Sequence, residues 1–507
     1  MSKKIRENLI ERPPVVVVMG HIDHGKSTLL DFIRKTNVVE NEAGSITQHI
    51  SAYEVLYEKN KKEKKKITFI DTPGHAAFSN VRATGVCLAD IAILIISAED
   101  GVKPQTIEAY KSIQESNIPV VVAINKIDKQ NANVEKIKQE LLENEIFLEG
   151  LGGNIPFNMI SAKTGQGVSE LLETVLLVAD MEELTGNQGE PASGFVLESK
   201  INTQKGTEIT AIIKNGRMKK GDFIVINNKV SPIRGLENVL GEPINEATFS
   251  NPIKLIGIKA VPETGTSFVT FLSKKEAENF ISNQVNKSDV LTKRFSQKIN
   301  TSDNEEKTKI LIIIKADVSG TIDAIQQEIK KIEQERADIQ IISAGVGDIN
   351  ENDIKLAGNK GDVLIVGFNV KINQQIKSLA ERSNIKIVIV DVIYKLTEWL
   401  EENIKNLIPK IKVEEQTGSA KIMKLFSKSK DGQIIGGKVK EGKIILSSDV
   451  KILRRDYEIG KGIIINLQKQ KIQVKEVSEG DEFGMNLKSK IDVASGDVLS
   501  AYKIIEK

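Results

Sequence analysis

The sequence contains one cysteine, Cys87, and no apolar run long enough to cross a bilayer. A single cysteine excludes an intramolecular disulfide framework and fits a reducing compartment. The longest apolar stretches, such as "IAILII" and "ILIII", are far shorter than the ~20 residues of a membrane-spanning helix. The first twelve residues, "MSKKIRENLIER", lack the apolar core of a signal peptide. These absences predict a cytoplasmic protein with no membrane contact.

Neither sign of charge is in large excess, but the charge is unevenly distributed. The net charge is +2, whereas the part from Pro409 to the end has 20 Lys and Arg against 14 Asp and Glu. A basic C-terminal part suits contact with nucleic acid. A lysine-rich solvated surface explains the same count, and the sequence leaves both readings open. The lysine run "KNKKEKKK" at 59–66 is likewise read as a solvated hairpin tip or as an RNA contact.

A chain of 507 residues is too long for one hydrophobic core, so we expect several domains. Apolar runs that alternate with helical patterns are typical of a mostly parallel sheet covered on both faces. Short alternating runs broken by Gly, Pro and Asn are typical of a small antiparallel barrel. The predicted fold is therefore multidomain α/β plus β: an N-terminal tail (1–12), an α/β domain (13–180), an antiparallel β-barrel (190–275), a helical linker (276–306), a smaller α/β domain (307–390), a long connecting helix (391–408) and a C-terminal β-barrel (409–507).

The stretch "GHIDHGKS" fits the pattern of a phosphate-binding loop between a strand and a helix. Its glycines let the backbone fold so that successive N–H groups point at the phosphates, and the helix N-terminus adds its dipole. Lys26 can reach the β- and γ-phosphates, and the Ser27 hydroxyl can ligate Mg²⁺. The predicted phosphate-binding residues are Gly20, His21, Ile22, Asp23, His24, Gly25, Lys26, Ser27 and Thr28.

Three further motifs stand at predicted strand ends, in the order that a guanine-nucleotide site requires. In "DTPG", Asp71 can hold the Mg²⁺ shell and the Gly74 N–H can approach the γ-phosphate. In "NKID", Asp128 can accept from guanine N1–H and the 2-amino group, donors that adenine does not offer there. The motif "SAK" can present a backbone N–H to guanine O6. The predicted guanine pocket consists of Asn125, Lys126, Asp128, Ser161, Ala162 and Lys163, the predicted cofactors are GTP/GDP and Mg²⁺, and residues 13–180 are predicted to be a P-loop GTPase domain.

All four histidines lie in the first 75 residues. A zinc site would explain the clustering, but such sites usually need Cys or carboxylate partners at fixed spacing. His75 directly follows Gly74, where a neutral imidazole can orient the attacking water or take its proton, so we predict that His75 is catalytic. We expect structural or local hydrogen-bonding roles for His21, His24 and His49. Thr47 can complete the Mg²⁺ shell when a γ-phosphate is present, which would make its loop a switch.

The motifs "GHIDHGKS", "ITQHI", "DTPGHAAF", "NKIDK" and "SAK" resemble those of the translational GTPases. The stretches "RPPVVVVMGHIDHGKSTLLD" and "EAGSITQHI" resemble specifically the bacterial translation initiation factor two family. The resemblance continues through "PASGFVLES", "IIIKADVSGTIDAI", "GVGDINENDI", "VGFNV" and "VIYKL", and thus covers nearly the whole chain. By this resemblance the N-terminal extension common in the family would be absent, since the predicted GTPase domain begins at about Pro13.

The resemblance implies a factor that binds initiator tRNA to the small ribosomal subunit with GTP, promotes subunit joining and hydrolyses GTP on the ribosome. The implied partners are the small and large ribosomal subunits, initiator (formyl-)methionyl-tRNA and other initiation factors, with a monomer off the ribosome. Ser27, Thr47 and Asp71 would hold Mg²⁺, partly through water, and the large subunit would reposition His75. The last barrel would hold the formyl-methionyl end of the tRNA.

That last barrel departs from the family pattern. The family often has cysteines at the positions of Gly437 and Phe483, and an arginine–aromatic pair at those of Lys469 and Gln470. Two positions still match, Glu482 and Gly484. We therefore expect initiator-tRNA binding with altered or weaker dependence on the formyl group. A GTPase that delivers another tRNA and a ribosome-associated assembly or stress switch without tRNA remain alternatives.

Overall fold

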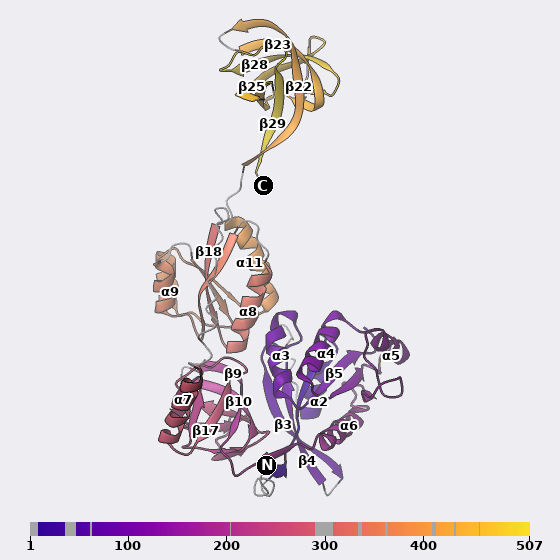
Figure 1. The fold of residues 1–507 in the computed structure, drawn as a ribbon, viewed down its shortest axis with the longest axis vertical. Coiled ribbons are helices and arrows are strands. Elements are labelled where there is room, and N and C mark those ends of the chain that lie inside the picture. Colours follow the sequence, from indigo (N-terminus) through magenta and orange to yellow (C-terminus); the bar gives the residue numbers. More distant parts are fainter. Residues whose placement is uncertain are drawn as a thin grey trace. The chain divides into compact units, whose positions relative to one another are not determined.

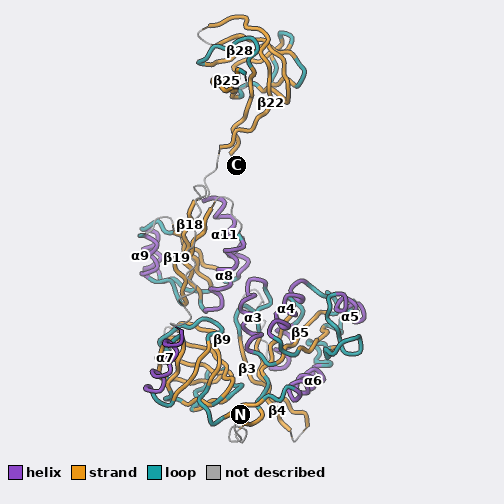
Figure 2. Tube along the Cα trace, viewed as in Figure 1, coloured by secondary structure: helices purple, strands orange, loops and turns teal. Residues whose placement is uncertain are grey.

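The chain was analysed as a computed structural model (Figure 1), which describes residues 9–35, 47–60, 63–202, 204–288, 308–332, 337–359, 363–407, 412–429, 432–455 and 457–506. It forms two compact units, Met1–Lys405 and Asn406–Lys507. Among the helices in these ranges, none has the length and apolar character needed to cross a membrane. Figure 2 shows where helices and strands alternate and where strands predominate.

The first α/β unit is built on a six-stranded sheet in the order β3-β4-β2-β5-β6-β7. All neighbours are parallel except the β3–β4 hairpin. Every residue of β2 and β5 is buried, because helices cover both faces of such a sheet. The strands are β2 (Val15–Gly20), β3 (Ser51–Asn60), β4 (Glu63–Asp71), β5 (Ile91–Ser97), β6 (Val120–Asn125) and β7 (Phe157–Met159), and the helices are α2 (Lys26–Arg34), η3 (Ala76–Phe78), α3 (Ser79–Leu88), α4 (Pro104–Ser116), α5 (Val134–Glu143) and α6 (Val168–Met181).

The first barrel is an antiparallel seven-stranded sheet in the order β13-β12-β17-β9-β10-β16-β14, accompanied by the pair β11–β15. Alternating apolar side chains from these strands form one core cluster. The strands are β9 (Ser193–Asn202), β10 (Gly206–Asn215), β11 (Arg217–Lys219), β12 (Phe223–Ile226), β13 (Lys229–Pro232), β14 (Gly235–Asn238), β15 (Glu246–Thr248), β16 (Pro252–Ile256) and β17 (Ser267–Phe271).

Two segments that the sequence predicts to be a tail and a linker pack in part against other elements. Within the predicted tail 1–12, β1 (Leu9–Glu11) pairs antiparallel with β8 (Thr185–Asn187), while residues 1–8 lie outside the described part. Within the predicted linker 276–306, helix α7 (Lys274–Ser288) packs on β12, β13 and β17, and residues 289–306 lie outside the described part. Both segments therefore belong to the packed structure as far as it is described.

A buried ionic cluster joins the first α/β unit to the first barrel. Asp90 accepts two hydrogen bonds from the guanidinium of Arg12, at 2.6 and 2.7 Å, and one from Nζ of Lys214, at 2.6 Å. The backbone N–H of Val15 also donates to this carboxylate at 2.9 Å. Although burial raises the pKa of Asp90, these donors outweigh it and hold the pKa below its usual value. The carboxylate is therefore shared between the two modules as a charged group.

The second α/β unit has four parallel strands in the order β19-β18-β20-β21. It alternates strands with helices throughout, as the sequence pattern predicts. Its elements are β18 (Thr308–Ala316), α8 (Ser319–Lys331), β19 (Ala337–Val346), α9 (Glu351–Gly358), β20 (Val363–Phe368), α10 (Gln374–Arg382) and β21 (Lys386–Val390), followed by the connecting helix α11 (Ile393–Leu407).

The C-terminal unit is a closed antiparallel barrel. Six strands follow in the order β22-β29-β24-β25-β28-β23, and a pairing of β22 with β23 closes the ring. The strands are β22 (Lys412–Ser429), β23 (Gly432–Ile445), β24 (Asp449–Arg454), β25 (Tyr457–Lys469), β28 (Glu482–Ser489) and β29 (Val498–Glu506), with the short strands β26 (Ile472–Gln473) and β27 (Glu476–Ser478) beside them. The predicted class, α/β plus β with two barrels and a connecting helix, is confirmed.

Candidate nucleotide-binding site

The predicted phosphate loop connects β2 to α2 at the carboxyl edge of the first sheet. Its two glycines are required by close approach as well as by conformation. A Cβ on Gly20 would lie 2.4 Å from the carbonyl oxygen of Ile95, and a Cβ on Gly25 would lie 2.3 Å from Nδ2 of Asn125. Both residues also have positive φ, +146° and +92°. No other residue fits either position without displacing a neighbour.

Lys26 is buried against this loop. Its Nζ donates to the carbonyl oxygens of Gly20 at 3.0 Å and His21 at 2.7 Å, and a Cβ on Gly74 would lie 2.5 Å from it. Burial lowers the pKa of Lys26 to about 8, with the nearby Asp71 carboxylate opposing that effect. The amino group is therefore held in the loop beside Gly74, and an incoming anionic ligand would favour its charged form.

Oxygen ligands suited to a hard cation come together beside Lys26. Ser27 Oγ and Thr47 Oγ1 lie 2.9 Å apart, although 20 residues separate them in sequence. Asp71 ends strand β4 and is 6% exposed. The three residues predicted to hold Mg²⁺ thus lie at the same edge of the sheet, with two of their hydroxyls in contact.

Asn125 connects three loops. It ends strand β6, and its side-chain amide donates to the carbonyl oxygen of His24 in the phosphate loop at 2.9 Å. Its Oδ1 accepts from the backbone N–H of Ala162 at 2.9 Å. The residue is 2% exposed, so both bonds are shielded from water. One side chain therefore aligns the "GHIDHGKS", "NKID" and "SAK" segments with one another.

The remaining predicted guanine-contacting groups lie around that connection. Asp128 is exposed, and a hydrogen bond from Ser161 is the main reason why its pKa lies below the usual value. Lys126 has a left-handed backbone (φ 65°), and its Nζ lies 3.0 Å from Asp100 Oδ2. Lys163 is exposed beside the buried Ser161 and Ala162. Asp128 is thus charged near pH 7.

His75 lies at the phosphate end of this site. Its Nδ1 accepts from the backbone N–H of Ala77 at 3.0 Å, and its carbonyl oxygen accepts from the guanidinium of Arg82. Burial is the largest effect on its pKa, which lies below 6.5. The ring is therefore neutral near pH 7, and because Nδ1 is an acceptor its proton is on Nε2.

Tyr394, in the first turn of the connecting helix α11, lies beside His75. The rings of Tyr394 and His75 have centroids 4.2 Å apart and are nearly perpendicular, at 86°. A cavity of about 190 Å³ is lined by Ile22, Asp23, Gly25, Lys26, Ser27, Thr28, Thr47, Gly74, His75 and Tyr394. Tyr394 was not among the site residues that the sequence motifs predict. The only signal was its place in "VIYKL", a stretch quoted for its family resemblance.

The other histidines have different surroundings. His24 is 1% exposed, packs edge-on against His21 at 5.0 Å, and has its pKa lowered by burial to about 3. His49 lies between two carboxylates that belong to other modules. Within the described ranges, no three His, Cys, Asp or Glu residues are grouped as a metal site would need.

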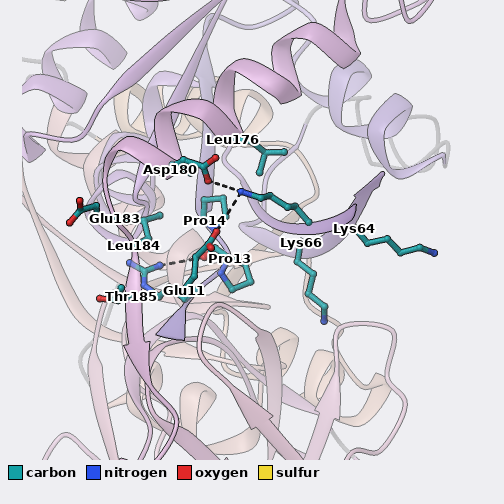
Figure 3. A pocket seen from close by; sticks show the side chains of 13 residues that line it. Glu11, Pro13, Pro14, Lys64, Lys66, Leu176, Asp180, Glu183, Leu184 and Thr185 are labelled. Carbon is teal, nitrogen blue, oxygen red and sulfur yellow. Dashed lines mark hydrogen bonds and ion pairs between the residues drawn. The ribbon is translucent and has the colours of Figure 1, made fainter. Parts of the chain in front are cut away.

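A second hollow, of about 540 Å³, lies beside the first residues of β4, near the tip of the β3–β4 hairpin (Figure 3), and is lined by Glu11, Arg12, Pro13, Pro14, Lys64, Lys65, Lys66, Leu176, Ala179, Asp180, Glu183, Leu184 and Thr185. Its cations are all paired with acids. Lys65 Nζ lies 2.7 Å from Asp180 and 3.5 Å from Glu11. Lys64 and Lys66 pair with Glu58 and Glu54. This hollow therefore offers no unneutralised charge for phosphate.

In the C-terminal barrel, the positions that depart from the family pattern line or support a surface groove. The groove has a volume of about 970 Å³, and Gly437, Lys469, Gln470, Glu482, Phe483 and Gly484 contribute to it. A Cβ on Gly437 would lie 2.6 Å from Phe483 Cζ, so the buried ring uses the space that the glycine leaves. The two departures are therefore sterically matched. Lys469 Nζ pairs with Asp481 at 2.5 Å.

Three protein-family models match successive parts of the chain. Residues 11–180 match the Elongation factor Tu GTP binding domain, residues 191–271 match Elongation factor G domain 2, and residues 282–401 match Translation-initiation factor 2.

Relatives match over almost the full chain. Translation initiation factor IF-2 of Anoxybacillus flavithermus is 40% identical over 506 residues, which are 99% of this chain and 69% of that protein. The factor of the same name from Bacillus subtilis is 40% identical over 99% of this chain and 70% of its own length. A crystal structure of GDP-bound aIF5B from Aeropyrum pernix is 26% identical, covering 97% of this chain and 92% of that chain at a TM-score of 0.48. From the sequence identity and the matched domains, the chain belongs to the translation initiation factor IF-2 family and is a translational GTPase that binds GTP and GDP.

Proposed function

We propose that the chain uses GTP to place initiator tRNA on the small ribosomal subunit, promotes joining of the large subunit, and hydrolyses GTP on the ribosome. The observation that carries the nucleotide part is the Asn125 side chain, which bonds the phosphate loop and the "SAK" loop together from the end of β6. The tRNA part is supported by the family membership and by the groove in the C-terminal barrel.

Ser27, Thr47 and Asp71 would hold Mg²⁺ in this site. Neighbouring ligands of an octahedral Mg²⁺ ion, with bonds of about 2.1 Å, lie about 3 Å apart. The 2.9 Å between the hydroxyl oxygens of Ser27 and Thr47 fits that spacing. The ion would neutralise charge that develops on the phosphate oxygens. Lys26, already beside Gly74, would turn from the loop carbonyls to the β- and γ-phosphates.

His75 would act in this reaction as a hydrogen-bond donor. Since its Nδ1 accepts from Ala77, the free Nε2–H can orient the attacking water or a phosphate oxygen. In this tautomer the ring has no lone pair available on Nε2 to take a proton. Of the two roles that the sequence suggests, water orientation is therefore the one that the hydrogen bonding favours.

The guanine part of the proposal is tested by Asp128→Asn. The carboxamide presents a donor where the guanine 2-amino group had been, so xanthosine nucleotides should be preferred over guanosine nucleotides. Competition binding on the full chain measures this. Retained guanine preference would show that another residue recognises that edge.

The tRNA part is tested by protection of charged initiator tRNA against deacylation. The full chain with a non-hydrolysable GTP analogue should protect both methionyl- and formylmethionyl-tRNA, with a smaller difference than a relative that keeps the family residues. Phe483→Cys is the matched variant, because it restores the family residue and leaves Gly437 in place. Absence of protection for both tRNAs would refute the tRNA role.

A further inference from the structure

The first barrel and the second α/β unit meet along two short segments. Residues 199–201 of β9 run antiparallel to residues 317–319, at the passage from β18 to α8, with a backbone bridge from Lys200 to Val318. The backbone N–H of Ser199 donates to the Ser319 hydroxyl at 3.2 Å. This junction brings two carboxylates together, Glu198 from the barrel and Asp317 from the α/β unit.

Asp317 occupies a special place in its sheet. In the sheet, β19 lies on one side of β18 and β20 lies on the other. The direction in which successive strands are added therefore reverses between β18 and β20. Asp317 follows β18 and Asn369 follows β20, and Asn369 Nδ2 donates to Asp317 Oδ2 at 2.5 Å. In open α/β sheets, the crevice at such a reversal, beyond the carboxyl ends of the strands, is where ligands bind.

A side chain of the first α/β unit lies beside Asp317 at this reversal. His49 Nε2 is 3.4 Å from Asp317 Oδ2, and His49 Nδ1 is 3.6 Å from Glu198 Oε1. The three side chains are partly buried, with exposures of 35% for His49, 16% for Glu198 and 21% for Asp317. Three modules therefore meet at one imidazole.

The two residues before His49 make contacts of their own. Thr47 Oγ1 lies 2.9 Å from Ser27 Oγ at the nucleotide site, and Gln48 Nε2 donates to the carbonyl oxygen of Asp391, just before α11, at 3.1 Å. Consecutive Cα atoms are 3.8 Å apart, so Thr47 and His49 can be separated by at most about 7.6 Å. A displacement of one by several ångströms must therefore move the other.

We propose that the notch between Glu198 and Asp317 is a docking site for His49, and that docking holds Thr47 where it can meet the cation and the γ-phosphate. His49 is on this account a positioning residue that acts through Thr47. The second α/β unit thereby senses the occupied state of the switch at the reversal of its strand order, the place where related folds bind small molecules. The inference rests on the proposed GTP switch and adds the element that detects it.

A merely structural contact would affect all nucleotide states alike, so the test compares two states. The full chain and its variants are titrated, with Mg²⁺, against GDP and against a non-hydrolysable GTP analogue. His49→Ala and Asp317→Asn should each weaken analogue binding about three- to fivefold, the range for the loss of one net polar contact, and leave GDP binding unchanged. The double variant should be no weaker than either single variant. His49→Gln, whose amide can still donate to Asp317, should restore most of the difference.

Asp348→Asn is the matched control. Asp348 lies at the same sheet edge, but its carboxylate accepts from the backbone N–H of Lys371 at 2.8 Å. Its effect should add independently to that of His49→Ala. Hydrogen exchange of residues 47–50 with bound analogue should be faster in His49→Ala than in the unaltered chain.

Equal weakening of GDP and analogue binding, or additive effects of His49→Ala and Asp317→Asn, would overturn the docking role. If the unaltered chain binds neither nucleotide, the proposed function itself is refuted, and that result is distinct from the first two.

Discussion

Asn125→Ala is the sharpest test of how the nucleotide site is held together. The substitution removes two hydrogen bonds of 2.9 Å from a side chain that is 2% exposed, and leaves the His24 carbonyl and the Ala162 N–H without partners. Each lost bond costs about 1 kcal/mol, and each stranded group adds to that, so we expect a total of about 2–4 kcal/mol. At 1.4 kcal/mol per factor of ten, the cost corresponds to about thirty- to several-hundredfold, divided between stability and binding.

The assay is GDP affinity measured with a fluorescent analogue, together with the thermal unfolding midpoint of the nucleotide-free chain. Because the bonds align the loops rather than fill a core, most of the cost should appear in GDP affinity, with a loss of at least about tenfold. Asn133→Ala is the matched control. Asn133 caps α5, where its side chain accepts from the Lys136 N–H at 3.0 Å, so its loss should cost about 1 kcal/mol of stability with no effect on GDP. GDP affinity within twofold of the unaltered chain for Asn125→Ala would refute the reasoning.

Three further changes have defined outcomes. His75→Ala should keep GTP affinity but cost about 100-fold in ribosome-stimulated hydrolysis, the scale for one positioned hydrogen-bond donor at the reacting groups, and unchanged turnover would exclude the catalytic role. His24 has a pKa of about 3 in the folded chain and an ordinary pKa of 6.5 in the unfolded chain, so only the unfolded chain takes up its proton between about pH 7 and pH 5. The free energy of opening β2 should therefore fall by about 2 kcal/mol over that range, as measured by hydrogen exchange. His24→Asn should reduce that fall, and an equal fall in the variant would assign it to other groups. Tyr394→Leu removes an edge-to-face contact of about 1 kcal/mol from His75 and should raise ribosome-independent hydrolysis about two- to fivefold, whereas an unchanged rate would show that the contact does not restrain the ring.

The sequence predicts where the nucleotide-site motifs lie in the fold, because their placement depends on local pattern. Gly20, Asp71 and Asn125 each end an apolar strand, and parallel strands bring their carboxyl ends to one edge. Once the periodicity identifies the strands, the placement of these residues follows. Their individual roles in binding and hydrolysis remain predictions.

The contacts between modules could not be predicted in this way. Tyr394 reaches His75 across more than 300 residues, and Gln48 bonds to Asp391 across 343. These contacts depend on how whole surfaces fit, and neither the helix pattern around Tyr394 nor the polar run around Gln48 contains that information. The same holds for β1, where three residues that look like part of a tail complete a pair with β8.

The cluster at Asp90 has a consequence for how the molecule can move. If the first barrel separated from the first α/β unit, Lys214 would leave, and a carboxylate that is 8% exposed would lose one of its two cations. Removing one partner from a buried charged group costs about 3–5 kcal/mol, far above thermal energy, so the first barrel and the first α/β unit should not separate through thermal motion. The two modules should therefore turn as one body, and we expect a change at the nucleotide site to be taken up where the first α/β unit meets the second α/β unit and α11, at the contacts of His49, Gln48 and Tyr394.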